Sequence, residues 1–437
     1  MSSTQQSGGG TATSAVPPTS TSTPRLLPSA SGWWYLGGRR LVLLGPAAAD
    51  AAGRLDPAVE RQLLATGAHG PTPVRAYALT ALTTTACNLG CAYCFQNTGP
   101  DPRGGSQPPR IDGSAMSRQT ARETVEFAAA RMAEAGLDAL DLHLSGGEPL
   151  LNPAGCRDLL EFAGPRGLRS ARLTSNGTLL TPTLAGELAG AGLRSVRITL
   201  DGRREEHDLI RVRRSGGEGT FDVLMARLAK ASAATELRWE LRVNVSQHNR
   251  DGLHALLDQL AERVDPDRCQ IMFALVNDTG VGYRNTLARD ADLVDRFVGW
   301  LGHAAERGFR IRRPAATRPD LVGSSRGRLG VVVSSDGTLY GRVETAGRPD
   351  AAVGTLHTGY RPEAEIAGRW RGAGPDPALR AFRDAVDARV LDFLHATGRL
   401  DPPAQLPDPT GSATPAKPVG PVGPAPAAGL SACGGRR

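Results

Sequence analysis

The sequence predicts an α/β protein whose main part is a partial (β/α)6 barrel. From Tyr77 onward, short apolar runs bounded by turn formers or charged residues alternate with longer segments of helical periodicity. Six such units follow one another, and this alternation is typical of a parallel sheet covered by helices. Six units suit a partial barrel better than the closed eight-stranded one. In either architecture we expect the functional residues at the C-terminal ends of the strands.

Each unit has a strand and a helix that the sequence locates. The strands are expected at 77–85, 138–144, 169–175, 194–200, 238–245 and 269–276. The helices are expected at 117–136, 155–164, 182–191, 221–234, 250–263 and 290–307. The first helix shows the signals most fully, because Ser117 is a suitable N-cap and Gly136 is a natural residue just beyond a C-terminus.

Two tails flank the folded part of the chain. Residues 1–31 are rich in Ser, Thr, Gly and Pro, and residues 401–437 are rich in Pro, Ala and Gly. Such segments cannot bury enough apolar surface to pack a core, so both are expected to be disordered. The barrel itself is expected over residues 76–310.

Two smaller regions complete the expected domain organisation. Residues 32–75 form an N-terminal accessory region, in which WWYLGGRRLVLLG predicts a hairpin and the segment after it a helix. Residues 320–400 form a C-terminal extension. It contains a hairpin that turns at Asp336-Gly337 and a last helix over 377–397.

The composition narrows the partners and the compartment of the protein. The 437 residues include 51 Lys and Arg against 44 Asp and Glu, a net charge of +7, without a long basic run. Neither a nucleic-acid partner nor a membrane partner is therefore expected, since no apolar stretch is long enough to span a bilayer. The start of the chain lacks the basic residues and apolar block of a signal peptide, so the reducing cytoplasm is the expected compartment.

A three-cysteine motif follows the first strand. Cys87, Cys91 and Cys94 have the spacing C-x3-C-x2-C within TTTACNLGCAYCFQN. Three thiolates on one short loop can bind three irons of a [4Fe–4S] cluster, and the fourth iron is then open to chelate S-adenosylmethionine. A structural zinc site would need a fourth ligand, usually from a second C-x2-C pair, which the sequence lacks. Unrelated buried thiols are the other alternative.

Further motifs follow the later strands in order. HLSGGEPLL ends the second strand, and TSNGTLLT, TLDGRREEHDLIRV and RVNVSQHN end the third, fourth and fifth. Together with Tyr93 before the last cysteine, this set resembles the radical S-adenosylmethionine (SAM) superfamily. Within it, the motifs resemble the subgroup of sulfatase-maturating enzymes and peptide maturases called SPASM or twitch proteins. The resemblance covers about residues 76–275 and, more weakly, 325–360.

The resemblance implies a partial TIM-like barrel that holds one [4Fe–4S] cluster and SAM. In the family, the backbone and Glu of a GGEP motif meet the methionine amino group of SAM; here that motif is Gly146, Gly147, Glu148 and Pro149. Thr199 matches a ribose-contacting position, with Thr for the more usual Ser. Arg211 matches an arginine that pairs with the SAM carboxylate, for which a guanidinium is well shaped. Further candidates for cofactor contact are Tyr93 and Ser175.

Other polar residues near the expected active face have two interpretations. Arg242 and Asn244 either line the pocket or occupy the polar face of a strand. Ser175 and Asn176 either contact the site or form the turn before Gly177. No general acid or base is assigned. The acidic and His residues near the active face, which can equally cap or pair locally, are Asp201, Glu205, Glu206 and His207.

The C-terminal extension departs from the SPASM pattern, which carries further cysteines for additional clusters. The usual first cysteine is replaced, with Arg342 close to its place, and only Cys433 follows. One cysteine cannot build a four-iron site, so a single cluster and a degenerate SPASM/twitch-like extension are expected. Cys156 and Cys269 are expected to be small buried residues.

The resemblance implies an enzyme that cleaves SAM reductively to a 5′-deoxyadenosyl radical and modifies a ribosomally synthesised peptide or protein. A small-molecule substrate in natural-product or cofactor biosynthesis is the alternative. Residues 33–72 either help to hold a leader peptide or cap the barrel. A non-catalytic binding protein is disfavoured, because a scaffold needs neither the cysteines nor the GGEP motif. A flavodoxin or ferredoxin-type electron donor is expected, since each cleavage consumes an electron.

Overall fold

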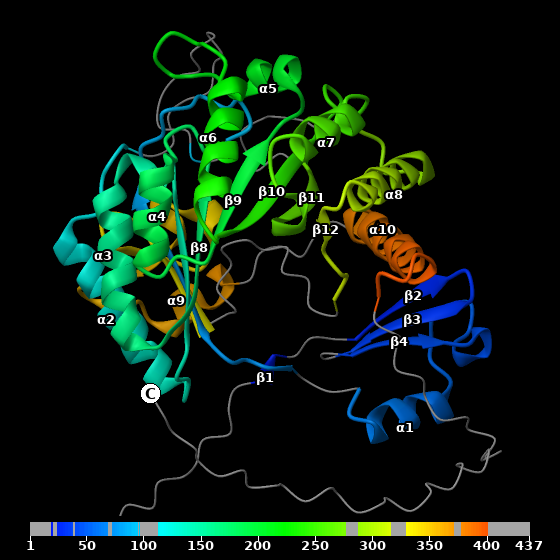
Figure 1. Ribbon diagram of the computed structural model, residues 1–437. Coiled ribbons are helices and arrows are strands. Elements are labelled where there is room, and N and C mark those ends of the chain that lie inside the picture. The colour runs from blue at the N-terminus through cyan, green and yellow to red at the C-terminus, as the bar shows by residue number, and fades with distance from the viewer. Residues whose placement is uncertain are drawn as a thin grey trace, which may run out of the picture.

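The computed structural model describes residues 19–20, 24–37, 40–68, 72–94, 96, 112–276, 287–315, 329–370 and 377–400. Within them, consecutive strands pair in parallel in the order of the chain, as Figure 1 shows. These strands are β6 (Tyr77–Thr84), β7 (Leu140–Gly146), β8 (Leu168–Ser175), β9 (Ser195–Leu200), β10 (Arg238–Val245) and β11 (Cys269–Leu275). The predicted partial (β/α)6 barrel is confirmed.

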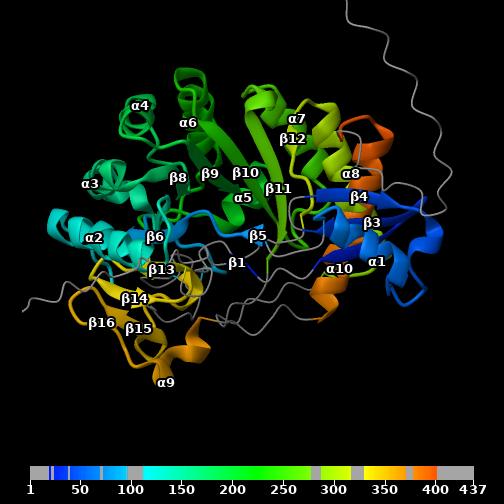
Figure 2. The same cartoon turned by 90° about the horizontal axis from the view of Figure 1, so that it is seen from below.

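Helices cover the outer face of this sheet (Figures 1 and 2). They are α2 (Arg118–Glu134), α3 (Pro153–Ala163), α4 (Pro182–Gly190), α6 (Phe221–Ala234), α7 (Leu253–Ala261) and α8 (Ala291–Glu306). All begin and end within a few residues of the predicted bounds. Helix α2 is capped as the sequence indicates, because the Ser117 hydroxyl accepts a hydrogen bond from Thr120 N. The short helix α5 (Arg204–Ile210) was not predicted.

Alternation along the strands gives the sheet one apolar and one polar face. Val196, Ile198 and Leu200 of β9 are fully buried in the main core, together with residues of α6. Side chains alternate along a strand, so Arg197 and Thr199 project from the opposite, inner face. Strand β10 repeats this pattern, with alternate buried apolar residues Trp239, Leu241 and Val243. The helices therefore pack on the apolar face, and the inner face carries polar residues.

The C-terminal extension continues the same sheet. Strand β13 (Gly330–Val333) pairs in parallel with β6, and β14 (Thr338–Tyr340), β15 (Ala352–Thr355) and β16 (Gly359–Tyr360) follow in antiparallel order. The predicted hairpin between β13 and β14 is confirmed. Gly337 in its turn has φ +84°, which glycine adopts without strain. At the other edge of the sheet, β12 (Arg310–Ile311) pairs with β11. A short helix, α9 (Glu363–Ile366), follows β16.

The N-terminal region forms a separate three-stranded antiparallel sheet. It comprises β2 (Arg25–Ser29), β3 (Gly32–Gly37) and β4 (Arg40–Leu44), and α1 (Pro57–Ala65) follows it. The predicted hairpin and helix are confirmed. Strand β2, however, lies in the segment expected to be a disordered tail, so that prediction was wrong for residues 25–29. The strand is held by pairing with β3, by burial of Leu27 and by ion pairs from Arg25.

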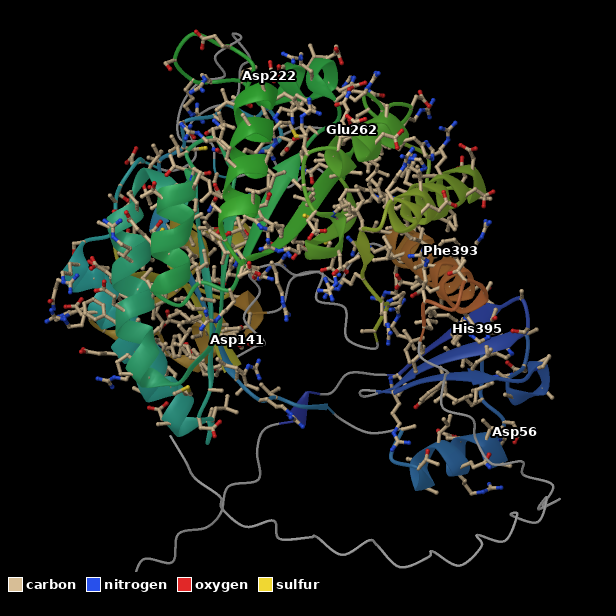
Figure 3. The ribbon with its side chains drawn as sticks, in the orientation of Figure 1. Asp56, Asp141, Asp222, Glu262, Phe393 and His395 are labelled. Atoms are coloured by element: carbon tan, nitrogen blue, oxygen red, sulfur yellow. The ribbon has the colours of Figure 1, made fainter. Side chains whose placement is uncertain are left out.

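The last helix, α10 (Pro377–Ala396), joins this N-terminal sheet to the barrel. It packs against α8 and β2, at the opposite edge of the main sheet from β14–β16 (Figure 2). Trp34 Nε1 donates to Asp392 at 2.8 Å, and the Trp34 ring meets the ring of His395 edge-on with centroids 5.6 Å apart. Figure 3 labels His395 and its neighbour Phe393 on this helix. The helix was assigned to the C-terminal extension, but its partners are elsewhere. Contacts between residues some 360 positions apart leave no local signal in the sequence.

The remaining predictions concern the ends of the chain and the membrane. Residues 1–18 and 401–437, which make up most of the two expected tails and include Cys433, lie outside the described residues. Strands β1 (Thr19–Ser20) and β5 (Thr72–Pro73) pair with each other. In the described ranges, none of the helices has the length and apolar character needed to cross a bilayer.

Candidate active site

The three motif cysteines lie together in the loop that leaves β6. Cys91 is buried, and Cys87 and Cys94 pack with it around Leu89 and Ile210. Burial raises the pKa of Cys91 to about 12, the nearby Arg211 lowers it, and Cys94 raises it again. The pKa of Cys87 is also raised, first by burial and then by Cys91 and Cys94. A bare thiolate is therefore unfavourable here, and a bound metal centre would remove that penalty by taking the thiolates as ligands.

The number of cysteines sets which metal centre this loop can hold. The three thiolates of a cubane cluster bind three different irons and leave the fourth iron open. A structural zinc site takes four protein ligands. In the described parts of the chain, no three His, Cys, Asp or Glu side chains are grouped as ligands of a single metal ion.

The glycines of the GGEP motif allow two backbone segments to touch. Gly147 N donates to Thr84 O at 3.0 Å, and Glu148 N donates to Ala86 O at 2.9 Å, which ties the end of β7 to the start of the cysteine loop. A Cβ on Gly146 would lie 2.2 Å from Thr84 O, and one on Gly147 would lie 2.4 Å from Ala86 O. Both positions therefore require glycine for this close approach. Pro149 then opens a 3-10 turn.

The Glu148 carboxylate is fully buried and is held by protein donors. Its Oε1 accepts from Leu150 N at 3.0 Å and from Ser175 Oγ at 2.8 Å, and its Oε2 accepts from Asn176 N at 2.7 Å. Burial raises its pKa, and the same hydrogen bonds oppose that rise. The carboxylate thus clamps the end of β7 to the end of β8. In this structure Ser175 and Asn176 support Glu148, and Asn176 Nδ2 also donates to Asn88 Oδ1 in the cysteine loop at 2.8 Å.

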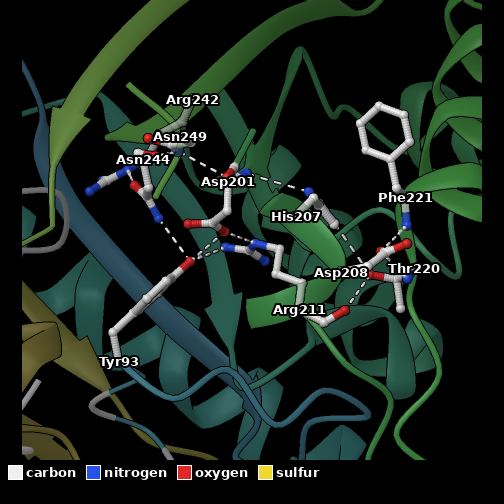
Figure 4. Close-up of polar contacts among 10 residues, drawn as sticks. All are labelled: Tyr93, Asp201, His207, Asp208, Arg211, Thr220, Phe221, Arg242, Asn244 and Asn249. Carbon is white, nitrogen blue, oxygen red and sulfur yellow. Dashed lines mark hydrogen bonds and ion pairs between the residues drawn. The ribbon is translucent and has the colours of Figure 1, made fainter. Parts of the chain in front are cut away.

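A second group of polar side chains, which we call the Tyr93 network, consists of Tyr93, Asp201, Arg211 and Asn244 (Figure 4). Its charged members Arg211 and Asp201 lie near Cys91. The Tyr93 hydroxyl donates to Asp201 Oδ2 at 2.7 Å and accepts from Arg211 Nη2 at 2.8 Å and from Asn244 Nδ2 at 2.9 Å. Arg211 Nε donates to the same Asp201 oxygen. Burial alone would lower the pKa of Arg211, but Tyr93 and Asp201 raise it well above its ordinary value. The guanidinium is therefore charged and neutralised within the protein.

One acceptor of this network has no protein partner. Asp201 Oδ1 is shielded from solvent and receives no hydrogen bond from any described residue. A buried carboxylate oxygen without a donor is unfavourable, and a bound molecule with a donor group would satisfy it. SAM carries such donors on its ammonium and ribose groups. The Tyr93 network therefore fits this cofactor, although Arg211, expected to face the SAM carboxylate, has Asp201 as its carboxylate partner here.

His207 and Asp208 shape the turn that presents Arg211. Asp201 N donates to His207 Nδ1 at 3.3 Å, so this nitrogen is an acceptor, and burial followed by the charge of Arg211 holds the His207 pKa well below its usual value. Asp208 Oδ1 accepts from the backbone N–H groups of Thr220 and Phe221 at 2.7 and 2.9 Å. Thr220 Oγ1 in turn donates to Arg211 O at 2.7 Å. These groups position Arg211 and are not free for acid–base chemistry.

The other two acidic candidates lie in helix α5. Glu206 accepts from Arg203 one helical turn earlier, at 2.7 Å. Glu205 lies in the first turn of α5. Of the four acid or base candidates, only Asp201 joins the Tyr93 network.

Strand β10 adds residues to the inner face of the site. Thr199 of β9 lies beside Arg242 in the strand register, and Arg242 Nε donates to Asn244 Oδ1 at 2.8 Å. Asn249 was not predicted from the sequence; its Nδ2 donates to Asp201 O and to Asn244 O at 2.8 and 2.7 Å. The only signal for it was the cluster of Asn and Ser residues after the fifth strand.

Comparison with a protein-family model defines the class of the chain. Residues 82–243 match the model described as the Radical SAM superfamily, so the chain carries a radical SAM domain. The cofactors of this domain are a [4Fe–4S] cluster and SAM, as the sequence indicated. Cys87, Cys91 and Cys94 are the residues suited to hold the cluster.

The individual relatives of the chain include a synthase, a maturase and a cyclase. AdoMet-dependent heme synthase of Methanosarcina barkeri is 25% identical over 54% of this chain and 60% of its own length. Mycofactocin maturase MftC of Mycolicibacterium smegmatis is 28% identical over 39% of this chain and 38% of its own. GTP 3′,8-cyclase of Moorella thermoacetica is 30% identical over 35% of this chain and 43% of its own. The chain thus matches less than two thirds of the length of each.

A solved structure agrees with the fold. The structure described as native anSMEcpe with bound AdoMet has a TM-score of 0.54, with 16% identity, and covers 74% of this chain and all of that one. At this identity the likeness concerns the fold alone.

Proposed function

We propose that the protein is a radical SAM enzyme that uses one [4Fe–4S] cluster to cleave SAM reductively and modifies a ribosomally synthesised peptide or protein. The observation that carries this proposal is the loop in which Cys87, Cys91 and Cys94 lie together beside the Tyr93 network. When bound, the cluster and SAM supply the electron and the 5′-deoxyadenosyl group that abstracts a substrate hydrogen atom. A flavodoxin or ferredoxin-type protein delivers the electron.

The residues of the chain hold, orient and shield the reacting groups. The cysteine thiolates ligate the cluster, and the buried Glu148 fixes the backbone of the GGEP motif against the cysteine loop. Asp201 Oδ1 accepts a donor group of SAM, and Thr199 lies on the same inner face, one strand from Asn244. Burial of the network excludes bulk solvent, which limits side reactions of reactive intermediates.

A peptide substrate is supported by relatives of two kinds. MftC is a maturase, and a structure of anSMEcpe with bound AdoMet and a peptide shares the fold with a TM-score of 0.55. A small-molecule substrate is the second candidate. It is favoured by the likeness to GTP 3′,8-cyclase and by a partly open cavity of about 220 Å³ on the inner face of the barrel.

The radical chemistry is tested by anaerobic reconstitution with iron and sulfide, followed by addition of dithionite and SAM. We expect about four irons per chain and release of 5′-deoxyadenosine. Both should be lost in a Cys87→Ala, Cys91→Ala, Cys94→Ala triple variant, whereas Cys156→Ala should retain them, since the Cys156 thiol is buried against Thr83 and Pro149. A reconstituted protein that holds about eight irons would refute the single cluster. The two substrate candidates separate on whether a short peptide encoded beside the gene forms a stable complex with the protein.

A further inference from the structure

The inner face of the barrel holds a cavity of about 220 Å³ below the Tyr93 network. Strands β9, β10 and β11, the segment after β12, and helices α8 and α10 supply its walls. The described residues that line it include a single carboxylate, Asp387, and several arginines: Arg25, Arg197, Arg242, Arg312, Arg313 and Arg383. We call it the arginine cavity. Apolar side chains complete the lining, among them Phe273, Phe297 and Phe382.

Arg197 is the innermost of these arginines and is not satisfied by the protein. Its side chain is only 3% exposed, and Nη2 pairs with Glu240 at 2.6 Å. Its Nε and Nη1 are buried and have no hydrogen-bond partner among the residues described. A buried charged donor without an acceptor is strongly unfavourable, so these nitrogens mark a place for an acceptor that the fold does not supply.

The surroundings of Arg197 add positive charge rather than cancel it. Arg242 is beside it on β10, and its pKa is lowered by burial and then by the charge of Arg197. Arg172 of β8 behaves similarly: burial and then Arg197 lower its pKa to about 10, and its Nε also lacks a partner. Glu240, already paired with Arg197, is the one acid that β8–β10 contribute to this group. One buried and two partly buried guanidinium groups thus share this carboxylate, although Asp141 and Asp201 also raise the pKa of Arg172 and of Arg242, respectively.

The remaining acids near the cavity are engaged elsewhere. Asp384 and Asp387 of α10 both accept from Arg25 Nη2, at 2.6 and 2.5 Å. Asp141 of β7 pairs with Arg169 at 2.5 Å, near the opposite end of the strands from the cysteine loop. Neither pair supplies an acceptor to Arg197. An anion of the substrate would supply one.

The cavity connects directly to the radical site. Arg242 Nε donates to Asn244 Oδ1, and Asn244 Nδ2 donates to the Tyr93 hydroxyl, as Figure 4 shows. Arg242 and Asn244 are two residues apart on β10, which is about 7 Å along a strand. A group bound by Arg242 therefore lies one short step below the network beside the cysteines. The rest of the same molecule would extend toward the cluster.

We propose that the arginine cavity binds a carboxylate of the substrate, with Arg197 and Arg242 as its ligands. This proposal rests on the proposed function and deepens it by naming the chemical class of the substrate: an acid whose carboxylate stands on an apolar stem. Guanidinium groups recognise carboxylate oxygens through charge-assisted hydrogen bonds. The aromatic side chains Phe273, Phe297 and Phe382 pack against the stem. The acid is either a free small molecule or an acidic residue of a peptide.

The test measures binding to the full-length protein by isothermal titration calorimetry, with and without the reconstituted cluster. The probes are glutarate and the peptide Ala-Ala-Glu-Ala-Ala with blocked ends, and the peptide with Gln in place of Glu is the control probe. We expect saturable binding of at least one acid probe, weakened about tenfold or more by Arg242→Gln. Arg54→Gln, at a side chain 81% exposed and far from the cavity in the N-terminal region, should change nothing.

A second variant shows whether lost binding results from misfolding. Arg197→Gln alone would leave Glu240 unpaired, so Arg197→Gln is combined with Glu240→Gln, which keeps the net charge. This double variant should also lose affinity about tenfold or more while its melting temperature stays near that of the wild type. Preference for glutarate identifies a small acid, and preference for the Glu peptide identifies a peptide substrate. Both support the proposal.

Two results would overturn the carboxylate site: no binding of either acid probe to the wild type, or equal binding to the wild type and both variants. Either result leaves 5′-deoxyadenosine formation intact and so leaves the proposed function standing. Conversely, the acid probes could bind in a way that depends on the arginines while the protein fails to cleave SAM. That result would refute the radical chemistry and support the carboxylate site.

Discussion

The Tyr93 network and the arginine cavity are two buried polar groups on the same inner face, and they are unsatisfied in opposite ways. In the Tyr93 network, Arg211 is neutralised by Asp201, and the atom left without a partner is an acceptor, Asp201 Oδ1. In the arginine cavity, the atoms left without partners are donors, Nε and Nη1 of Arg197. The interior thus offers an acceptor beside the cysteines and donors on Arg197, which lies four residues earlier on β9, about 13 Å along the strand.

This difference indicates which group each region is built to receive. An unpaired carboxylate oxygen suits a cofactor with an ammonium or hydroxyl donor, and unpaired guanidinium nitrogens suit an anionic substrate. The two regions share Asn244, which contacts Tyr93 on one side and Arg242 on the other. Occupation of one region can therefore alter the position of side chains in the other.

The largest expected effect that tests this comparison comes from Asp201→Asn. The change removes the negative partner of Arg211 at a position that is 1% exposed, and leaves a buried guanidinium unneutralised. Removing one member of a buried ion pair lowers the free energy of unfolding by about 3–5 kcal/mol. Urea unfolding measures this loss. Glu240→Gln is the matched change in the arginine cavity.

The Glu240 variant should lose less stability than the Asp201 variant, because Glu240 is 17% exposed and contacts Arg197 through a single ion pair. Saturating glutarate should restore part of its stability, since a bound carboxylate replaces the lost charge. Asp201→Asn leaves the arginine cavity intact, so glutarate should stabilise this variant only by as much as it stabilises the wild type. If the two variants lost equal stability and responded equally to glutarate, the contrast between the two regions would be refuted.

Tyr93→Phe is expected to have an intermediate effect. It removes a hydroxyl that contacts three partners but leaves the Asp201–Arg211 pair in place, so we expect a loss of about 2 kcal/mol. Because the same hydroxyl orients Asp201, the variant should also bind SAM more weakly in equilibrium dialysis. Tyr340→Phe is the control: Tyr340 is a buried tyrosine of β14, outside the site, and its loss should leave SAM binding unchanged. Unaltered SAM affinity in Tyr93→Phe would separate the network from the cofactor.

Much of the fold could be predicted because local sequence patterns indicate its strands and helices. Each of the six barrel strands alternates or runs apolar between turn formers, and the structure places all of them within two residues of their predicted bounds. Cys156 and Cys269 are 0% exposed, as small apolar side chains in a helix and a strand should be. The pairing of β13 with β6 and of β2 with α10 could not be predicted, because it depends on segments that are about 250 and 360 residues apart.

The parts of the site formed by motifs of fixed residue spacing could be predicted from the sequence. The parts formed by residues that come together from different strands could not. The cysteine loop and the GGEP motif stand out in the sequence, and the structure brings them into contact. Arg242 and Asn244 were ambiguous, because alternation along a strand shows which residues share a face but not whether that face meets solvent or a barrel interior. Arg172, Arg197 and Arg242 come from three different strands, so only the assembled sheet reveals that Arg197 lies close to the other two.

The smallest expected effect concerns His143 of β7, which lies on the inner face beside Arg172 of β8. Its Nε2 is 2.8 Å from Thr174 Oγ1, and its pKa is held well below the usual value, first by burial and then by the charges of Arg172 and Arg197. In the unfolded chain the imidazole titrates near pH ~6.5. Below that pH the unfolded state binds a proton that the folded state does not, so the free energy of unfolding falls as the pH falls.

His143→Gln should remove about 1 kcal/mol of the loss of unfolding free energy measured between roughly pH 7.5 and 5.5. The exposed His357→Gln is the control. Saturating glutarate should also reduce the loss, because a carboxylate beside Arg197 offsets the charge that keeps His143 neutral. A pH dependence identical in the wild type and His143→Gln would show that the arginines do not control this imidazole.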